Sequence, residues 1–311
     1  MVRVLIIGGS GFIGRNLVRY LLAEGLNVAV LDRVPDSTGL FEGPFFQGDS
    51  QDPEFILEAL QAFLPEVVYH LAANSDISAG VADASLDFGD TLMTTISVAQ
   101  ACEAHPVSQI VFASSSAIFG QVEGPIAESV DGFNKPVSWY GRAKLASEYV
   151  LRTFATANPE TAILITRFPN VVGSLATHGV IFDFVHKLRQ DPSQLQVLGD
   201  GNQQKPYVHA GELVKAMEYF RKQLNLGEVM TVNLGPTDTI TVKEIAREVT
   251  AALKVDPMIH FENKSIGWIG DIPKYEFDSS LMRSTGFTID LTSRQAVRLA
   301  AEELALEIEP T

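Results

Sequence analysis

The feature that most constrains the fold of this chain is a glycine-rich segment close to its amino terminus. An apolar run at residues 4–7 leads into Gly8-x-x-Gly11-x-x-Gly14, and residues 15–18 that follow have helical spacing. A buried strand, a glycine turn and a helix in this order are typical of the first unit of an alternating strand–helix fold. The sequence therefore predicts an α/β chain.

The alternation of strands and helices continues to about residue 170. Four more short runs of aliphatic and β-branched side chains follow, at residues 28–31, 67–70, 110–113 and 162–166. Strands that are buried on both faces have this composition, and helices between them imply parallel neighbours. We expect a doubly wound, Rossmann-type parallel sheet in residues 1–172.

Beyond residue 172 the regular alternation of strands and helices ends, and loops rich in Gly, Asp, Gln and Pro connect fewer elements. We expect a smaller α/β domain in residues 173–311, with some exchange of chain between the two domains. Local capping signals mark several helix starts in both parts of the chain. They are Asp52 before Pro53, Ser138 before a helix at 140–154, the capping box of Thr241 and Glu244, and a last helix expected at 293–306.

Composition narrows the possible functions. The formal net charge of −15 would repel a nucleic acid backbone or an anionic membrane. The single cysteine, Cys102, lies in a helical stretch and is interpreted as a buried apolar side chain, so neither a disulfide nor a Cys-rich metal site fits. The six histidines lack metal-ligand spacing, so no metal is expected. The start of the chain lacks a signal-peptide pattern and no apolar run reaches ~18 residues, so we expect a cytoplasmic protein without membrane or nucleic-acid partners.

The glycine-rich segment also predicts a dinucleotide site. Glycines let the backbone approach a pyrophosphate, and the helix that follows directs its N–H groups and its dipole at the negative charge. Asp32 closes the second apolar run 18 residues past Gly14, where a carboxylate would bind the ribose hydroxyls of adenosine. That carboxylate would repel a 2′-phosphate, which favours NAD over NADP, although Arg33 could serve a 2′-phosphate instead. Asp49 could accept a hydrogen bond from the adenine amine. The alternative interpretation of the glycine-rich segment is a tight turn that binds no ligand.

A phenol and an ammonium group stand four residues apart at Tyr140 and Lys144, on one face of an expected helix. A free tyrosine keeps its proton to about pH 10, so it acts as a base near neutral pH only when a nearby cation stabilises the phenolate. Three serines, Ser114 to Ser116, end the fourth apolar run at the edge of the sheet where such folds place their ligands. A hydroxyl there could hold the oxygen whose proton the tyrosine takes. The alternative for Tyr140 and Lys144 is a chance pair on a surface helix. The alternative for at least one serine is a polar strand end that caps the next turn.

Together these motifs resemble the extended short-chain dehydrogenases/reductases, in their NAD-dependent sugar-nucleotide epimerase/dehydratase group. The resemblance covers nearly the whole chain. It rests on Gly8-x-x-Gly11-x-x-Gly14, Asp32, Gly48-Asp49, His70-Leu71-Ala72-Ala73, residues 114–120, Tyr140-x-x-x-Lys144, residues 167–173 and Gly199-Asp200-Gly201.

The resemblance implies a role for individual residues, with NAD bound by residues 1–172 and a sugar nucleotide by residues 173–311. The implied catalytic residues are Tyr140, Lys144 and Ser115, with Ser116 as the alternative to Ser115. The implied NAD-binding residues are Gly8, Gly11, Phe12, Ile13, Gly14, Asp32, Arg33, Asp49, Ser50, Leu71, Ala72, Ala73, Ser114, Tyr140, Lys144 and Phe168. The implied UDP-sugar-binding residues are Ser115, Ser116, Tyr140, Asn170, Val180, Leu198, Lys205, Tyr207, Asp271 and Tyr275, with Leu198 packed on the uracil.

The resemblance also favours a 4-epimerase over a dehydratase. Sugar-nucleotide 4,6-dehydratases carry an Asp and a Glu directly after the catalytic hydroxyl to eliminate water, and this chain has Ser116 and Ala117 there. In the implied reaction, Tyr140 takes the 4-hydroxyl proton while hydride passes from C4 to the nicotinamide. The 4-keto sugar then turns over, and hydride returns to its other face. A 4-keto-sugar reductase and a dinucleotide sensor are the other classes, although a sensor lacks the Tyr and Lys that this chain retains.

The resemblance favours UDP-glucose and UDP-galactose as substrates. Tyr275 stands where the hexose 4-epimerases of the group gate the space beside C2, and its ring would disfavour an N-acetyl group. Uronate epimerases place an Arg shortly after the segment that corresponds to residues 170–173, but residues 174–180 contain none. N-acetylhexosamine and uronate substrates are the alternatives.

Some positions depart from the group's pattern. Lys205 and Trp268 stand where the group often has Arg for the diphosphate, and Arg167 could either compensate or form a structural ion pair. Thr91 replaces an Asn that usually braces the sheet. The helices expected at 93–103 and 140–154 correspond to the group's dimer surface, so the resemblance implies a homodimer.

Overall fold

The computed structural model describes residues 1–35, 39, 41–122, 124–129, 136–262, 264 and 272–308. The chain divides into two compact units, and each unit is built from several segments. Unit 1 comprises Met1–Ile118, Ser138–Arg167 and Val214–Val232, and unit 2 comprises Phe119–Val137, Phe168–Leu213 and Asn233–Thr311. The boundary expected after residue 172 falls inside the second of the three segments of unit 2.

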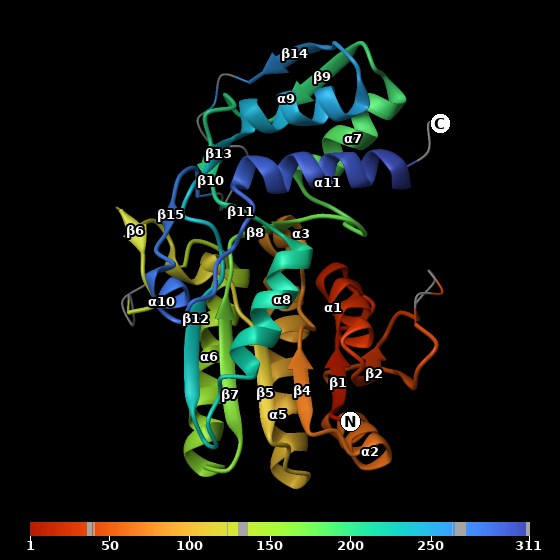
Figure 1. The fold of residues 1–311 in the computed structure, drawn as a ribbon, viewed down its shortest axis with the longest axis vertical. Helices are drawn as coiled ribbons and strands as arrows, with labels where there is room; N and C mark the ends of the chain where they lie inside the picture. Colours follow the sequence, from red (N-terminus) through yellow and green to blue (C-terminus); the bar gives the residue numbers. More distant parts are fainter. Residues whose placement is uncertain are drawn as a thin grey trace. The chain divides into compact units, whose positions relative to one another are not determined.

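A seven-stranded sheet forms the centre of unit 1, in the order β12-β7-β5-β4-β1-β2-β3 (Figure 1). Every neighbouring pair from β3 across to β7 is parallel. The strand order reverses beside β1, with β2 on one side and β4 on the other, which confirms the predicted doubly wound, Rossmann-type sheet. The strands are β1 Arg3–Ile7, β2 Asn27–Asp32, β3 Phe45–Gln47, β4 Val67–His70, β5 Gln109–Ala113, β7 Ala162–Arg167 and β12 Val229–Asn233.

Helices cover both faces of this sheet (Figure 1). On one face, apolar side chains of β1, β4 and β5 form a buried cluster with α2, α5 and α6. Side chains alternate along a strand, so Val68 of β4 enters this cluster whereas Tyr69 points to the opposite face and donates to Glu218 of α8 at 2.7 Å. These helices are α1 Phe12–Ala23, α2 Pro53–Phe63, α3 Ile77–Ala82, α4 Ala84–Asp87, α5 Thr94–Ala104, α6 Trp139–Ala157 and α8 Ala210–Arg221.

Unit 2 is built from short strand pairs and a separate apolar core. Three pairs are parallel, β8 with β11, β9 with β14 and β6 with β15, and β10 pairs with β13 antiparallel. Side chains of α7, α9 and α11 fill its core. The elements are β6 Pro125–Ile126, β8 Asn170–Val172, α7 Val180–Gln190, β9 Gln194–Val197, β10 Gln204–Lys205, β11 Tyr207–His209, β13 Ile240–Thr241, α9 Val242–Leu253, β14 Met258–Phe261, β15 Glu276–Phe277, α10 Ser280–Ser284 and α11 Ser293–Glu307.

Helix starts with a local sequence signal are where the sequence predicted them. Asp52 accepts hydrogen bonds from the first turn of α2, and Ser138 accepts one from the first turn of α6. Thr241 and Glu244 form the expected capping box of α9. Cys102 is buried in α5, which confirms its apolar role.

A π-helical turn at Phe88–Met93 precedes α5 and was not predicted. The hydroxyls of Thr94 and Thr95 donate back to the carbonyl of Thr91, and such back-bonding competes with a regular helical ladder. π-helical turns insert an extra residue into a helix and are frequent at functional sites. Among the described residues, no helix is long and apolar enough to cross a membrane.

Candidate active site

Two glycines of the glycine-rich loop are required by close packing within unit 1. Gly8 has φ +87°, and a Cβ atom there would lie 2.6 Å from the amide nitrogen of Ala72. A Cβ atom on Gly14 would lie 2.3 Å from the carbonyl oxygen of Gly8. The amides of Leu71 and Ala72 both donate to the carbonyl of Ile7. The structure therefore brings the predicted loop and the Leu71-Ala72-Ala73 segment together at the end of β1.

Gly11 is different because its missing side chain leaves open space. Gly11 is exposed, and a Cβ atom there would meet only the carbonyl oxygen of Gly8, at 3.4 Å. Gly11 is also the N-cap of α1, and no side chain caps the helix. The N–H groups of the first turn, at Phe12, Ile13 and Gly14, therefore lack a side-chain acceptor, and the residues fit the pyrophosphate of a dinucleotide.

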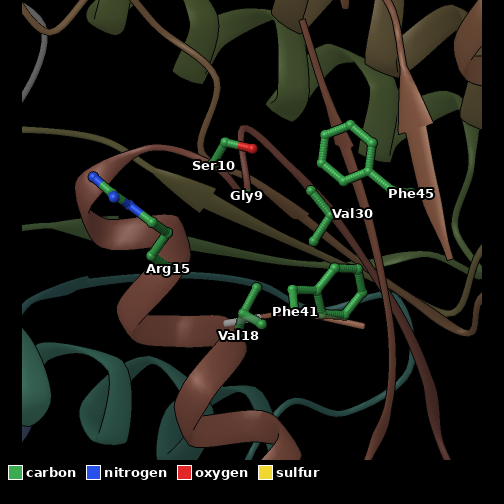
Figure 2. Close-up of a pocket in the computed structure, with 7 residues that line it drawn as sticks. All are labelled: Gly9, Ser10, Arg15, Val18, Val30, Phe41 and Phe45. Atoms are coloured by element: carbon green, nitrogen blue, oxygen red, sulfur yellow. The ribbon is translucent and has the colours of Figure 1, made fainter. Parts of the chain in front are cut away.

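A small hollow lies beside this loop, as Figure 2 shows. Val30 of β2 faces the loop closely, because a Cβ atom on Gly9 would lie 2.6 Å from its Cγ1 atom. The hollow contains none of the predicted NAD-binding residues, and its walls are mainly apolar. Its lining residues are Gly9, Ser10, Arg15, Val18, Val30, Phe41 and Phe45.

The two predicted adenosine-binding carboxylates lie in neighbouring turns. Asp32 accepts hydrogen bonds from the amides of Ser10 and Val34, at 2.9 and 3.0 Å. The carbonyl of Asp32 accepts from the amide of Gly48, at the start of the turn that carries Asp49 and Ser50. The end of β2, the glycine-rich loop and this turn are thus tied together in unit 1.

The guanidinium of Arg33 is paired with a residue that the sequence did not single out. Its Nη1 and Nη2 atoms donate to the two carboxylate oxygens of Asp90, at 3.1 and 2.7 Å. Gln51 also donates to Asp90, at 3.0 Å. Arg33 and Asp90 are 57 residues apart, so no local pattern could have indicated this pair.

The structure brings the predicted catalytic tyrosine and serine together. Tyr140 lies in the first turn of α6, and its phenol is hydrogen-bonded to the Ser115 hydroxyl, which also accepts from the amide of Ala117. Burial raises the pKa of Tyr140 to about 12, and the hydrogen bond from Ser115 opposes this rise. Ser116 begins the 3-10 turn Ser116–Phe119 after β5. Tyr140 therefore needs added positive charge to release its proton near neutral pH.

Lys144 is one helical turn from Tyr140 and almost fully buried, with 2% exposure. Its Nζ atom donates to the carbonyl of Ala113 at 2.6 Å and lies 5.8 Å from the centre of the Tyr140 ring. Burial lowers the pKa of Lys144 to about 7, against the opposing effect of Glu148. The sequence predicted a cation at this position, and burial brings the pKa of its ammonium close to neutral pH.

Ser114 is held by a buried polar network. Its hydroxyl donates to Glu148 at 2.5 Å, and Arg167 pairs with the same carboxylate through Nε and Nη2 at 3.0 and 2.7 Å. Arg167 and Glu148 are both buried. Of the two roles left open for Arg167, the structure shows the structural ion pair.

A second network surrounds Thr91, which stands where the group that the sequence resembles usually has Asn. Its hydroxyl accepts from the amide of Asn74, and its carbonyl accepts from the hydroxyl of Thr95. The Thr95 hydroxyl also lies 2.9 Å from Nε2 of His70, whose pKa is lowered by burial to about 3. His70 is therefore a neutral, buried bracing residue near Lys144.

The sequence missed Asp87, at the end of α4. Its carboxylate is buried, accepts from the side-chain amide of Asn74 at 2.9 Å, and accepts from the backbone amide of Tyr140. Burial raises the pKa of Asp87, and its charge contributes to raising the pKa of Tyr140. Asp87 and Tyr140 lie on different helices and far apart in the sequence, so no spacing motif relates them.

Two of the predicted substrate residues meet in unit 2. The side-chain amide of Asn170 donates to the Tyr275 hydroxyl and to the carbonyl of Pro206, each at 3.4 Å. Tyr275 is 7% exposed. The structure therefore places the buried Tyr275 side chain beside Asn170.

The other predicted residues of unit 2 are dispersed over several elements. Tyr207 is buried in the core of the unit, and Lys205 lies in β10. Val180 begins α7, and Leu198 follows β9 with 55% exposure. Phe168 is buried, whereas Asp271 and Trp268 lie outside the described residues.

Comparison with known proteins identifies the family. The model of the NAD dependent epimerase/dehydratase family matches residues 4–235. A UDP-glucose 4-epimerase of Corynebacterium glutamicum is 28% identical over 274 residues, which cover 80% of each chain. A crystal structure of a UDP-galactose 4-epimerase superposes with a TM-score of 0.86 and 30% identity, covering 99% of this chain and 100% of the other. The UDP-glucose 4-epimerase of Thermus thermophilus in complex with NAD gives a TM-score of 0.87 and 29% identity, with 97% and 99% coverage.

The family match spans the glycine-rich loop, Asp32 and the Tyr140-x-x-x-Lys144 pair. The structural matches extend over nearly all of the chain, unit 2 included. This chain therefore belongs to the NAD-dependent epimerase/dehydratase family.

Proposed function

We propose that the protein is a UDP-sugar 4-epimerase that interconverts UDP-glucose and UDP-galactose through a 4-keto intermediate. The observation that carries this proposal is the Tyr140 phenol, hydrogen-bonded to Ser115 and one turn from the buried Lys144, in a chain of this family. The names of its relatives support the same reaction.

The residues of unit 1 fit NAD. Gly11 offers an open backbone and uncapped N–H groups for the pyrophosphate, and Asp32 offers a carboxylate for the adenosine ribose. The chemistry that NAD supplies when bound is hydride transfer from and to C4 of the sugar.

Within this proposal, the proton of the 4-hydroxyl goes to the oxygen of Tyr140. Ser115 donates to the phenol oxygen and lowers its pKa, which opposes the effect of burial. An ionised Lys144, 5.8 Å from the ring, stabilises the phenolate, and Glu148 favours that ionised form. Tyr140 then returns the proton to the 4-oxygen of the epimer, so that the tyrosine ends each turnover in its starting protonation state.

A dehydratase is disfavoured by the residues next to Ser115. Elimination of water needs an acid and a base beside the sugar, and positions 116 and 117 hold Ser and Ala. The chain therefore offers a proton acceptor for C4 oxidation but no carboxylate in the positions where dehydratases carry theirs.

The preference for hexoses without an N-acetyl group rests on Tyr275. Its ring is buried and its hydroxyl accepts from Asn170, and the surrounding packing opposes movement of the ring. We propose that Tyr275 narrows the space beside C2. Replacing it with serine is expected to raise turnover of UDP-N-acetylglucosamine relative to UDP-glucose, as measured by initial rates on both substrates.

The experiment that tests the proposed function needs no added cofactor. Purified protein is incubated with UDP-glucose, and the anomeric proton signals are followed by NMR, with Tyr140→Phe as the matched control. UDP-galactose should form far more slowly with Tyr140→Phe than with the unsubstituted protein, and both proteins should release NAD when denatured by acid. If UDP-glucose is unchanged while the protein is folded and carries NAD, the substrate assignment is wrong. If turnover consumes an added reduced dinucleotide, the protein is a 4-keto-sugar reductase.

We further propose that the protein is a cytoplasmic homodimer that associates through α5 and α6. Large apolar side chains are exposed on or beside these helices, at Met93, Trp139 and Tyr149. A monomer would leave these side chains in water. Light scattering after size exclusion should give twice the mass of the chain, and Tyr149→Glu should shift the protein towards the mass of one chain.

A further inference from the structure

Asp90 is the centre of a cluster at the adenosine end of the predicted NAD site in unit 1. It lies in the π-helical turn Phe88–Met93 and accepts hydrogen bonds from Arg33 and Gln51. The Asp90 side chain is 18% exposed, and that of Arg33 is 58% exposed. The cluster joins three segments that are distant in the sequence: the end of β2, the turn before α2 and the turn before α5.

The contact between Arg33 and Asp90 uses the face of the guanidinium that would recognise a phosphate. Two parallel N–H groups pair with two oxygens of one carboxylate, and a guanidinium binds a phosphate through the same fork. Arg33 therefore cannot present this pair of donors to a 2′-phosphate while Asp90 holds it.

The carboxylates around Arg33 also disfavour a 2′-phosphate. The carboxylates that influence Arg33 are those of Asp90, Asp49 and Asp32, so three negative charges surround one positive charge. A 2′-phosphate placed beside them would be repelled, whereas the ribose hydroxyls of NAD carry no charge.

The position of Asp90 is itself fixed. Gln51 donates to Asp90, and the backbone of Gln51 is held by the Ser97 hydroxyl at 2.7 Å and by Asp49 at 2.9 Å. Asp90 is thus tied to the same turn that carries the predicted adenine-binding residue, and it cannot move away without disturbing that turn.

We propose that Asp90 is a specificity-determining residue for the dinucleotide, because it holds the Arg33 guanidinium away from a 2′-phosphate. The proposal rests on the use of NAD by this family. The sequence left open whether Arg33 would bind a 2′-phosphate. Arg33 stands next to Asp32, but its guanidinium is already paired with Asp90.

The test measures binding rather than turnover. The protein is freed of nucleotide with charcoal and incubated with equal concentrations of NAD and NADP, and the nucleotides retained after filtration are quantified by mass spectrometry. We expect Asp90→Asn to raise the ratio of bound NADP to bound NAD by about tenfold, because it releases Arg33 and removes one negative charge. NAD should remain the preferred nucleotide because Asp32 is unchanged.

Two further variants separate the release of Arg33 from a general change of charge. Asp49→Asn removes an equal charge from the cluster but keeps a side-chain oxygen that can accept from the amide of Gln51 and from adenine. The pair of Arg33 with Asp90 therefore stays in place, and the ratio of bound NADP to bound NAD should change much less than in Asp90→Asn. Adding Arg33→Gln to Asp90→Asn should abolish the gain in NADP. The proposal is overturned if Asp90→Asn leaves the ratio unchanged, if Asp49→Asn matches it, or if the double variant keeps the gain. Failure of the unsubstituted protein to retain NAD would instead contradict the cofactor assignment.

Discussion

Replacing the buried Lys144 with methionine should change how the stability of the protein depends on pH. Lys144 is 2% exposed, and burial lowers its pKa from an ordinary value of 10.5 to about 7. Between these two values the unfolded chain binds more protons at this position than the folded chain does. The contribution of Lys144 to folding is therefore unfavourable at pH 7 and becomes less so as the pH rises towards the pKa of the unfolded chain.

The size of this effect follows from the two pKa values. Linkage between protonation and folding gives a gain of about 2 kcal/mol in the free energy of unfolding between pH 7 and pH 9 for the unsubstituted protein. Lys144→Met removes this gain. The variant also loses the hydrogen bond to the carbonyl of Ala113, but that loss is nearly independent of pH and cancels when the two pH values are compared.

The assay is urea unfolding followed by circular dichroism at pH 7, 8 and 9. From pH 7 to pH 9, the unfolding free energy of the unsubstituted protein should rise by about 2 kcal/mol relative to that of Lys144→Met. Lys215→Met, at an exposed site on α8, serves as the control and should show a flat difference. A flat difference for Lys144→Met as well would refute the assignment of a desolvated, titrating ammonium at this position.

Three further predictions address the tyrosine and its surroundings. Tyr140→Phe should lower the rate of epimerisation by about 100- to 10,000-fold while the amount of NAD released by acid stays the same. Glu148→Ala removes the carboxylate that pairs with the buried guanidinium of Arg167, so chemical denaturation should show a loss of about 3–5 kcal/mol, and a loss below about 1 kcal/mol would contradict this role. Asp87→Asn removes a charge that raises the pKa of Tyr140, so the pH profile of turnover should shift to lower pH, and an unshifted profile would contradict the inferred coupling.

The sequence predicted those parts of the fold that depend on neighbouring residues. The β-branched runs indicated the strands, and the Asp52 and Ser138 caps marked the starts of α2 and α6, because a cap bonds within its own first turn. Tyr140 and Lys144 were found because four residues correspond to about one helical turn. The π-helical turn at Phe88–Met93 had no such signal.

The remaining features depend on contacts between distant segments. Asp90 meets Arg33 across 57 positions, and Glu148 meets Arg167 across 19. The low pKa of Lys144 comes from burial, which is a property of the packed fold and not of the Tyr-x-x-x-Lys spacing. The sequence could therefore place the ammonium beside the phenol, but it could not indicate that this ammonium titrates near pH 7.

The proposed reaction is tested most sharply by following the hydrogen at C4 of the sugar. The protein is incubated with UDP-glucose that carries deuterium at C4, in ordinary water and without added dinucleotide, and the UDP-galactose formed is analysed by NMR and mass spectrometry. We expect UDP-galactose that keeps the deuterium at C4, because the hydride that leaves the sugar returns to the same carbon. Loss of the deuterium to solvent, or formation of product only when a reduced dinucleotide is added, would contradict 4-epimerisation through a retained NAD.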